Sequence, residues 1–207
     1  LRFSASGLPA GLTLDPNTGL ITGTLASDAS VSGPYSITVT ATDAAGSAVA
    51  QTFQLAVSNP GPTAVADTLA LAESATQSGN VITGIGLGGD RADIDIDRDT
   101  LTVTLAGTGS AAPATAISAT GTALAGTHGI LTLKADGSYS YTATDGNLSN
   151  GQIVTDTFSY TVSDGQNGNA TTTLTITVTG SNAAPATGPN AVTIAEDTSH
   201  ILGAADF

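Results

Sequence analysis

The sequence predicts an all-β fold built of tandem β-sandwich domains, and three observations carry this prediction. Apolar and polar residues alternate with period two over many short segments, which is typical of strands with one buried face. These segments are rich in Thr, Val, Ile and Tyr, which fit a pleated, half-buried surface. Asp-Gly, Asn-Gly and Gly-rich turns separate them, and no window of about 11 residues shows the roughly 3.6-residue period of a helix.

The alternating segments recur along most of the chain. They span residues 35–43, 50–58, 101–107, 130–137, 138–146, 156–165 and 171–180. In one of them Tyr139 and Tyr141 share a face, so we expect them in the sandwich core, with carbohydrate stacking as the alternative. Asp15 in the segment DPNTG is expected in a turn, and Asp136 and Asp145, each followed by Gly, are expected in hairpin turns.

The charge balance favours cations as partners. The 207-residue chain has 17 Asp plus Glu against 4 Lys plus Arg, a formal net charge of -13. Nucleic acid and anionic membrane surfaces both require basic patches, so neither is an expected partner. All the acids except Glu73 and Glu196 are Asp, a short side chain that suits metal ligation and turns.

Catalytic machinery is missing from the sequence. Cys is absent, so no thiolate nucleophile, disulfide or Cys-based zinc site exists. His128 and His200 are unconnected, and no G-x-S-x-G nucleophile elbow occurs. No apolar run is long enough to span a membrane. We therefore expect a protein that is not an enzyme and does not insert into a membrane.

An internal repeat divides the chain. The segments that begin at Tyr35 and Phe158 share one plan: strand, Asp turn, strand, a Ser-Asn linker with Pro, then a short strand ending in Glu. The matching residues are Asp43 with Asp164, Asn59 with Asn182, and Glu73 with Glu196. We therefore expect domains at 1–59, 60–182 and 183–207.

Two of these domains are expected to be incomplete. Residues 1–59 lack a first strand pair, and 183–207 supply only first strands. Leu1 falls where Leu101 falls in the complete domain, just after an acidic loop. The chain is then either about one period of a longer array or an arbitrary fragment.

Particular motifs resemble known bacterial modules. Residues 3–25, with GLPAGL and DPNTGLITGT, resemble the dystroglycan-type, cadherin-like immunoglobulin module of bacterial surface proteins. Residues 62–180, with DIDRDTLTV, GTHGILTLKADGSYSYTATDG and DTFSYTVSDGQNG, resemble the VCBS repeat of large bacterial adhesins. Residues 184–199 resemble the opening of a further cadherin-like domain. The resemblance implies tandem Ig/cadherin-like sandwiches, an extracellular or cell-surface location, export by type I secretion, and calcium binding.

An acidic run is the main candidate site. Asp90, Asp93, Asp95, Asp97 and Asp99 lie in the segment GDRADIDIDRDTLTV. Alternate residues of an extended chain point to one side, so the carboxylates repel unless water or a cation neutralises them. Ile94 and Ile96 suggest that the opposite side packs inward, which favours a cation over a solvated loop. An EF-hand does not fit, because Arg98 and Thr104 stand where Gly and Glu are required.

The resemblance to cadherin-like domains suggests two calcium sites at domain junctions. The first is expected to combine an Asp turn, a linker Asn, a strand-end Glu and the acidic run: Asp43, Asn59, Glu73, Asp95, Asp97 and Asp99, with Asp67 either a ligand or a turn residue. The second is expected to combine Asp164, Asn182, Glu196 and Asp206, with Asp197 as an additional candidate. Hard oxygen ligands from separate segments suit the six to eight oxygens that Ca²⁺ takes.

Two functions remain open at this stage. In the first, the chain is a spacer, a stalk or filament segment whose calcium-filled junctions stiffen it outside the cell. In the second, it is an adhesive module that binds glycans, a surface or a neighbouring chain, including homotypic contacts. We expect the spacer, because no exposed aromatic platform is evident in the sequence.

Overall fold

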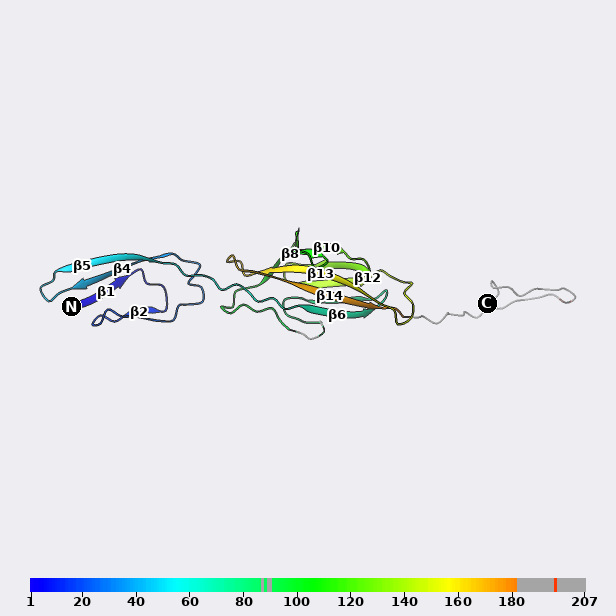
Figure 1. Ribbon diagram of the computed structural model, residues 1–207, viewed down its shortest axis with the longest axis horizontal. Helices are drawn as coiled ribbons and strands as arrows, with labels where there is room; N and C mark the ends of the chain where they lie inside the picture. The colour runs from blue at the N-terminus through cyan, green and yellow to red at the C-terminus, as the bar shows by residue number, and fades with distance from the viewer. Residues whose placement is uncertain (87, 89–90, 182–195, 197–207) are drawn as a thin grey trace.

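Every regular element in the described part of the chain is a β-strand (Figure 1). The computed structural model describes residues 1–86, 88, 91–181 and 196. The strands form two units placed end to end along the long axis of the molecule. The predicted all-β fold class is confirmed.

The first unit contains one three-stranded antiparallel sheet and one small hairpin. The sheet has the order β1-β4-β5. Its strands are β1 (Arg2–Ser6), β4 (Tyr35–Thr42) and β5 (Ala48–Leu55). The hairpin pairs β2 (Leu12–Leu14) with β3 (Ile21–Gly23). Ile37 and Ala29 are the buried hydrophobic residues here, so this unit has a thin core.

The second unit is a sandwich of two sheets. The larger has the order β6-β14-β13-β8-β9 and the smaller β10-β11-β12-β7. Strands of the larger sheet are β6 (Asp67–Ala72), β8 (Thr102–Thr108), β9 (Thr115–Ala116), β13 (Ile153–Ser163) and β14 (Asn169–Thr179). Those of the smaller are β7 (Thr76–Asn80), β10 (Thr122–Ala125), β11 (Gly129–Leu133) and β12 (Ser138–Ala143). All described pairs of strands are antiparallel except β6 with β14, which run parallel, and one isolated bridge, Gly109 with Phe158, is also parallel.

The core of the sandwich lies between these two sheets. Alternate residues of β13 and β14, among them Phe158 and Ile176, face residues of the smaller sheet such as Leu131. Tyr139 and Tyr141 are buried in this core, so the core prediction is confirmed and carbohydrate stacking by these rings is wrong. The ring of Tyr141 meets Phe158 edge to face at 6.2 Å.

The turn predictions have mixed outcomes. Asp15 accepts hydrogen bonds from the N–H groups of Asn17 and Thr18, as an Asx turn requires. Asp136 lies in the hairpin between β11 and β12, as predicted. Asp145 is not in a hairpin turn, because its loop connects β12 to β13 across the two sheets.

Candidate metal centre

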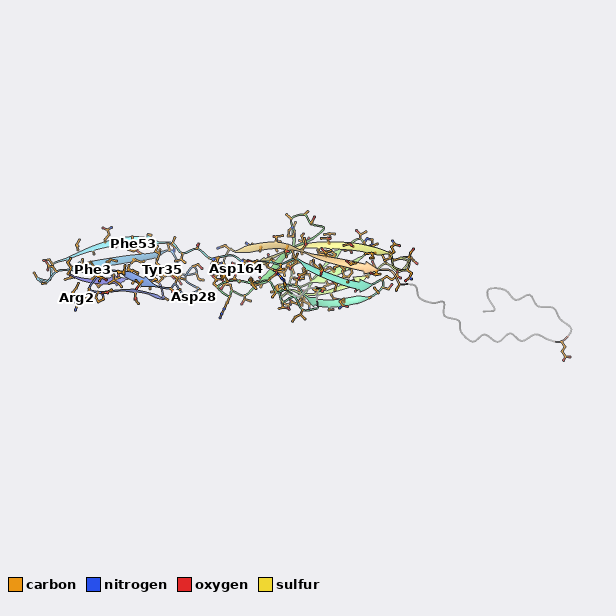
Figure 2. All side chains as sticks on the ribbon, turned by 60° about the horizontal axis from the view of Figure 1, so that its bottom comes forward. Arg2, Phe3, Asp28, Tyr35, Phe53 and Asp164 are labelled. Carbon is orange, nitrogen blue, oxygen red and sulfur yellow. The ribbon has the colours of Figure 1, made fainter. Side chains whose placement is uncertain are left out.

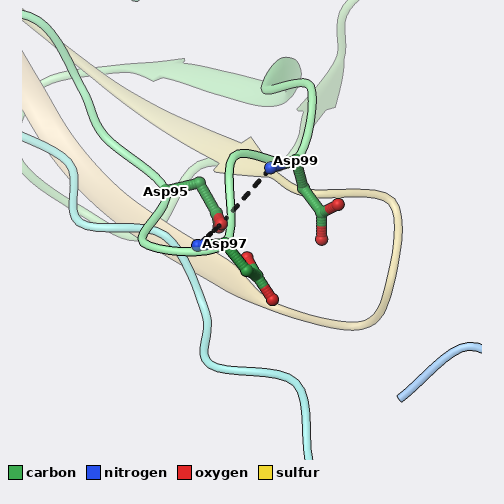
Figure 3. Close-up of side chains that lie close together, drawn as sticks. All are labelled: Asp95, Asp97 and Asp99. Carbon is green, nitrogen blue, oxygen red and sulfur yellow. Dashed lines mark hydrogen bonds between the residues drawn. The ribbon is translucent and has the colours of Figure 1, made fainter. Parts of the chain in front are cut away.

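Three aspartates of the loop before β8 gather at one end of the second unit (Figure 3). One carboxylate oxygen from each of Asp95, Asp97 and Asp99 lies within 4.8 Å of the other two. The Asp95 Oδ1 atom accepts hydrogen bonds from the N–H groups of Asp97 and Asp99, at 3.1 and 3.4 Å. This Asx-type turn, with Arg98 at φ 70°, brings the carboxylates together.

The isoleucines of this loop do not pack inward. Ile94 is 60% exposed and Ile96 is 81% exposed, so the prediction that they pack inward is wrong. The reason is the tight turn, which replaces the extended segment on which the prediction rested. Asp93, rather than an isoleucine, is the buried residue of the loop, and its Oδ1 atom accepts the Val65 N–H at 2.7 Å.

Several carboxylate oxygens in this loop are shielded from solvent and accept no hydrogen bond. They are Asp93 Oδ2, Asp95 Oδ2 and Asp97 Oδ1. A shielded acceptor is costly unless a donor or a cation faces it. The loop therefore has unused capacity to bind a hard cation through oxygen.

Desolvation and neighbouring carboxylates shift the pKa values of this loop, and hydrogen bonds to Asp97, Asp99 and Arg98 lower that of Asp95. Contact with the Asp95 carboxyl, followed by desolvation and the charges of Asp95 and Asp99, raises the pKa of Asp97 to about 6. Burial, and then the charges of Asp95, Asp164 and Asp28, raise the pKa of Asp99. Burial raises the pKa of Asp93 to about 6. A bound cation would favour the ionised forms instead.

The hairpin turn between β13 and β14 adds a fourth acidic residue. Asp164 is buried, and its Oδ1 atom accepts the N–H groups of Gln166 and Gly168 at 2.7 and 2.9 Å. Its Oδ2 atom accepts the Nδ2–H of Asn59, from the linker between the units, at 2.6 Å. A side chain at Gly168 would place Cβ 1.8 Å from this Oδ2, so the turn requires glycine there.

Residues of the first unit complete the arrangement. The Gln166 Nε2–H donates to Asp99 Oδ2 at 2.5 Å, and Gln166 Oε1 accepts the Ser30 hydroxyl at 3.1 Å. Asp28, two residues before Ser30 in the sequence, lies at the end of the first unit that faces Asp164 (Figure 2). A cleft of about 500 Å³ lies between the units and is lined in part by Ser30, Asn59 and Gln166. The acidic loop therefore lies where the two units meet.

Asp43 does not belong to this junction, so its predicted place in the first site is wrong. It lies in the turn between β4 and β5, where its Oδ1 atom accepts the N–H groups of Ala45 and Ser47. The junction lies at the other end of these strands, and Asp43 is eight residue steps from Tyr35 at that end, or about 26 Å at roughly 3.3 Å per residue. The equivalent turn residue in the second unit, Asp164, takes the predicted place of Asp43 beside Asn59.

Glu73 does not belong to this junction either. It lies at the far end of the second unit, where it accepts the N–H groups of Leu148 at 3.0 Å and Ser181 at 2.8 Å. The cause is the parallel pairing of β6 with β14, which places the end of β6 beside the end of β14. Asp164 precedes β14, so the length of that strand separates it from Glu73.

The remaining predictions have limited or no structural description. Asp67 is buried in β6 and accepts the Tyr160 hydroxyl at 2.7 Å, so it is not a turn residue. Glu196 is exposed in a turn. The other candidates lie outside the described residues: Asp90, Asn182, Asp197, His200 and Asp206.

Two residues of the junction have no counterpart among the predicted ligands. Asp28 lies in a segment without a recognisable motif, and its charge acts on Asp99. Gln166 is in the turn segment DGQNG, two residues after Asp164. The internal repeat offers no signal for Gln166, because it assigned this turn to the following linker at Asn182, whereas the structure places it beside Asn59.

Comparison with known families decides the identity of the chain. Residues 59–180, more than half of the chain, match the family model described as "Bacterial cadherin-like domain". The chain belongs to the bacterial cadherin-like domain family. Residues 1–58 of this cadherin-like chain match the family model described as "Putative Ig domain". No curated protein matches it.

Solved structures show only distant likeness to this cadherin-like chain. They include the endo-fucoidan hydrolase MfFcnA9 of glycoside hydrolase family 107, at 23% identity over 84% of this chain and 27% of that chain, TM-score 0.29. The human desmocollin-1 ectodomain matches at 16% identity over 86% of this chain and 33% of that chain, with a TM-score of 0.35. Mouse cadherin-23 EC22–24 matches at 17% identity over 86% of this chain and 52% of that chain, with a TM-score of 0.31. The chain thus spans between about a quarter and about half of these structures, and at such TM-scores none of them carries an argument about function.

Family membership indicates the general type of module to which the chain belongs. Cadherin-like domains are extracellular repeat modules of the adhesion type, they contact neighbouring or like domains, and they are typically non-enzymatic. They generally bind calcium, and the Asp95, Asp97 and Asp99 cluster is a set of carboxylates that can hold a metal. Within the described residues, no helix is long and apolar enough to cross a membrane.

Proposed function

We propose that this chain is a calcium-stiffened spacer in a large extracellular adhesin of a bacterium. The observation that carries the proposal is the position of the acidic loop. Shielded, unpartnered oxygens of Asp95 and Asp97 lie in a loop that contacts the first unit through Gln166 and Ser30. An ion bound there would hold the ends of two units together, which is the action that a stiff stalk requires.

The residues of the junction fit calcium chemically. Asp95, Asp97 and Asp99 would hold the ion, with Asp164 and Asp28 as further carboxylates and the Asn59 side chain as a neutral oxygen source. Ca²⁺ takes about six to eight oxygen ligands, and this set offers oxygen alone. In this proposal residues 1–59 and 60–182 are successive domains, and Asn59 belongs to their linker.

The internal repeat extends the proposal to a second junction. Asn182 corresponds to Asn59, so we assign it to the linker after the second domain, with Asp206 as a further candidate ligand of that junction. Glu196 corresponds to Glu73, which lies at the far end of its own unit. We therefore move Glu196 away from the second junction and to the far end of the third domain, 183–207.

The difference in calcium concentration between the cytosol and the outside of the cell would let the spacer stiffen only after export. Extracellular calcium modules have Kd values on the order of 10⁻⁴ to 10⁻³ M, so the cytosol leaves them empty. A flexible chain can then pass through a type I secretion channel and stiffen outside the cell. Each filled site adds about 2.7 kcal/mol of stability when calcium is about 100-fold above Kd.

A calcium titration of the full chain by calorimetry tests the proposal. Asp97→Asn removes one charged ligand and is expected to weaken calcium binding by roughly tenfold or more. Asp43→Asn is the matched control, because Asp43 closes the turn between β4 and β5, at the end of the first unit opposite the junction. Equal calcium affinity in both variants and the parent chain would exclude this site.

A further inference from the structure

Two buried aspartates lie near one tyrosine hydroxyl inside the second unit. Asp67, the first residue of β6, is 4% exposed, and Asp93, in the loop before β8, is 6% exposed. The Tyr160 hydroxyl of β13 donates to Asp67 Oδ2 at 2.7 Å. Desolvation, followed by the hydrogen bond to Asp67 and the charges of both aspartates, raises the pKa of Tyr160. Both negative charges therefore act on the same hydroxyl.

One hydroxyl cannot satisfy two carboxylates. A tyrosine O–H group donates a single proton, and the short distance assigns that proton to Asp67. Asp93 Oδ1 accepts the Val65 N–H at 2.7 Å, but Asp93 Oδ2 is shielded from solvent and accepts no hydrogen bond. A shielded carboxylate oxygen is costly unless a cation or a donor faces it. Asp93 Oδ2 is therefore an available ligand atom for a cation.

Two backbone carbonyl oxygens face the same hydroxyl. Val65 O is 3.4 Å and Val81 O is 3.5 Å from Tyr160 Oη, beyond the roughly 2.5–3.0 Å of ordinary O–H···O bonds. In the described part of the chain, no backbone N–H donates to either carbonyl. Oxygens about 2.4 Å from Ca²⁺ and at right angles to each other are about 3.4 Å apart, whereas Mg²⁺, at about 2.05 Å, brings them to about 2.9 Å. The observed spacing fits calcium.

These oxygens come from segments that only the fold brings together. Asp67 and Tyr160 lie on the larger sheet, and Val81 follows β7 of the smaller sheet. Asp93 precedes the junction carboxylates in the acidic loop. The hydroxyl lies away from the junction, because Tyr160 is four residues before Asp164, or about 13 Å at roughly 3.3 Å per residue.

We propose that a calcium ion binds inside the second unit between Asp67 and Asp93. A hydroxyl and two carbonyls complete its protein ligands, those of Tyr160, Val65 and Val81. Two carboxylates balance the charge of one divalent ion, so the filled site is neutral and can remain buried. Five protein oxygens leave at least one position for water, since Ca²⁺ takes about six to eight. This inner ion ties the two sheets together and fixes the start of the acidic loop, and it does not depend on an ion at the junction.

Counting calcium ions on the full chain by native mass spectrometry tests the inner site. Asp67→Asn should carry one ion fewer than the parent chain, because it removes a charged ligand of the inner ion and none of the junction. Asp97→Asn should lose the junction ion instead and keep the inner one. Asp43→Asn, a turn variant, should keep both. An Asp67→Asn chain with the parent's ion count overturns the inner site, whereas an unchanged count in Asp97→Asn overturns only the junction.

Terbium(III) luminescence locates the inner ion independently. Terbium(III) is a hard cation that takes oxygen ligands as calcium does, and it emits after a neighbouring tyrosine absorbs light. The chain has four tyrosines and no tryptophan. One of them, Tyr35, lies at the junction end of β4, where its hydroxyl donates to Ala29 O. In the Asp97→Asn background, Tyr160→Phe should remove most of the sensitised emission and Tyr35→Phe should leave it unchanged. The reverse result would place the remaining ion outside the core and overturn the proposal.

Melting temperatures distinguish an ion from a shared proton. If Asp67 and Asp93 share a proton instead, Asp67→Asn should lower Tm by the same amount with calcium and with chelator. The inner ion predicts a larger loss of Tm with calcium, because only the parent chain then gains stability from binding it. Equal losses in the two conditions overturn the proposal, and the comparison holds even where the variant is less stable in chelator.

Discussion

At the residue scale, the junction depends on a few polar atoms that face one another across two units. Asp164 is buried and fully engaged, with one oxygen closing its own turn and the other accepting the Asn59 amide. Gln166 reaches both the acidic loop and Ser30. Because these contacts are side chain to side chain, small changes in the turn are expected to act on the junction and on the turn together.

Gly168 provides a direct test of that dependence. In Gly168→Ala, the new Cβ would meet Asp164 Oδ2 at 1.8 Å and the Gly61 backbone at 2.7 Å, so the turn must shift. We expect a loss of stability of about 1–3 kcal/mol and weaker calcium binding. Gly146→Ala is the control, since its nearest neighbour is the Ser74 hydroxyl at 3.5 Å. Urea unfolding curves of the two variants measure the difference, and equal midpoints would contradict it.

The raised pKa values predict an unusual dependence of stability on pH. The pKa of Asp97 rises from 3.8 to about 6, and that of Asp93 rises likewise, so the folded state binds these protons more tightly than the unfolded state. Their contribution to stability is fully present below about pH 3.8 and is lost as pH rises through about 6. Calcium requires the ionised forms, so with calcium the sign reverses and stability falls as pH falls.

Thermal unfolding with chelator and with calcium measures this effect. As pH rises from about 4.5 to 7 in chelator, the parent chain should lose more stability than the Asp97→Asn variant, because the variant has no titrating carboxyl at residue 97. The comparison matters because Asp95, Asp15 and Asp136 have lowered pKa values and act in the opposite direction, and the pKa of Asp95 depends on its contact with Asp97. Parallel curves for the parent chain and the variant would show that Asp97 does not contribute.

At the element scale, strand direction decides which residues meet. The sequence correctly predicts the fold class, the tyrosine core and the repeat of the Asp turn, because these follow from local periodicity and turn chemistry. It does not predict that β6 pairs in parallel with β14, since pairing partners are long-range. For that reason Glu73 was expected at the wrong end of its unit. Asp43 and Asp164 were misplaced for a local reason, because each lies in a hairpin turn and the second strand of that hairpin, β5 or β14, runs away from the turn toward the following linker.

The position of Glu73 at the end of β6, far from the junction, predicts that replacing it lowers the stability of the fold without changing calcium affinity. Glu73→Gln should weaken the bonds to the N–H groups of Leu148 and Ser181, at a cost of roughly 1–3 kcal/mol in stability. Calcium affinity at the first junction should stay unchanged, because the length of β14 lies between them. Chemical unfolding and calorimetry report the two quantities separately. A large fall in affinity at this junction would place Glu73 among its ligands after all.

At the scale of the whole molecule, the two units differ in how much stability their own hydrophobic cores provide. The second has a two-sheet core, whereas the first buries little apolar surface and leaves the face of β5 open. Small domains with thin cores depend on external contributions. The junction ion is one such contribution, because it would bind the folded first unit at the end where the second unit begins.

Removal of calcium should therefore change the shape of the molecule before it unfolds the second unit. With calcium, the end-to-end arrangement of Figure 1 should give a long, narrow distance distribution in small-angle scattering. With chelator, repulsion among Asp95, Asp97, Asp99, Asp164 and Asp28 is no longer balanced. Among the described residues, the Asn59–Asp164 and Ser30–Gln166 hydrogen bonds then still link the units. We expect a broader distribution with a shorter mean, while circular dichroism of the strands changes little. Gln166→Ala should enlarge the effect in chelator and have little effect with calcium, because the ion then supplies the link. Identical distributions in both conditions would mean that the side-chain contacts alone fix the junction.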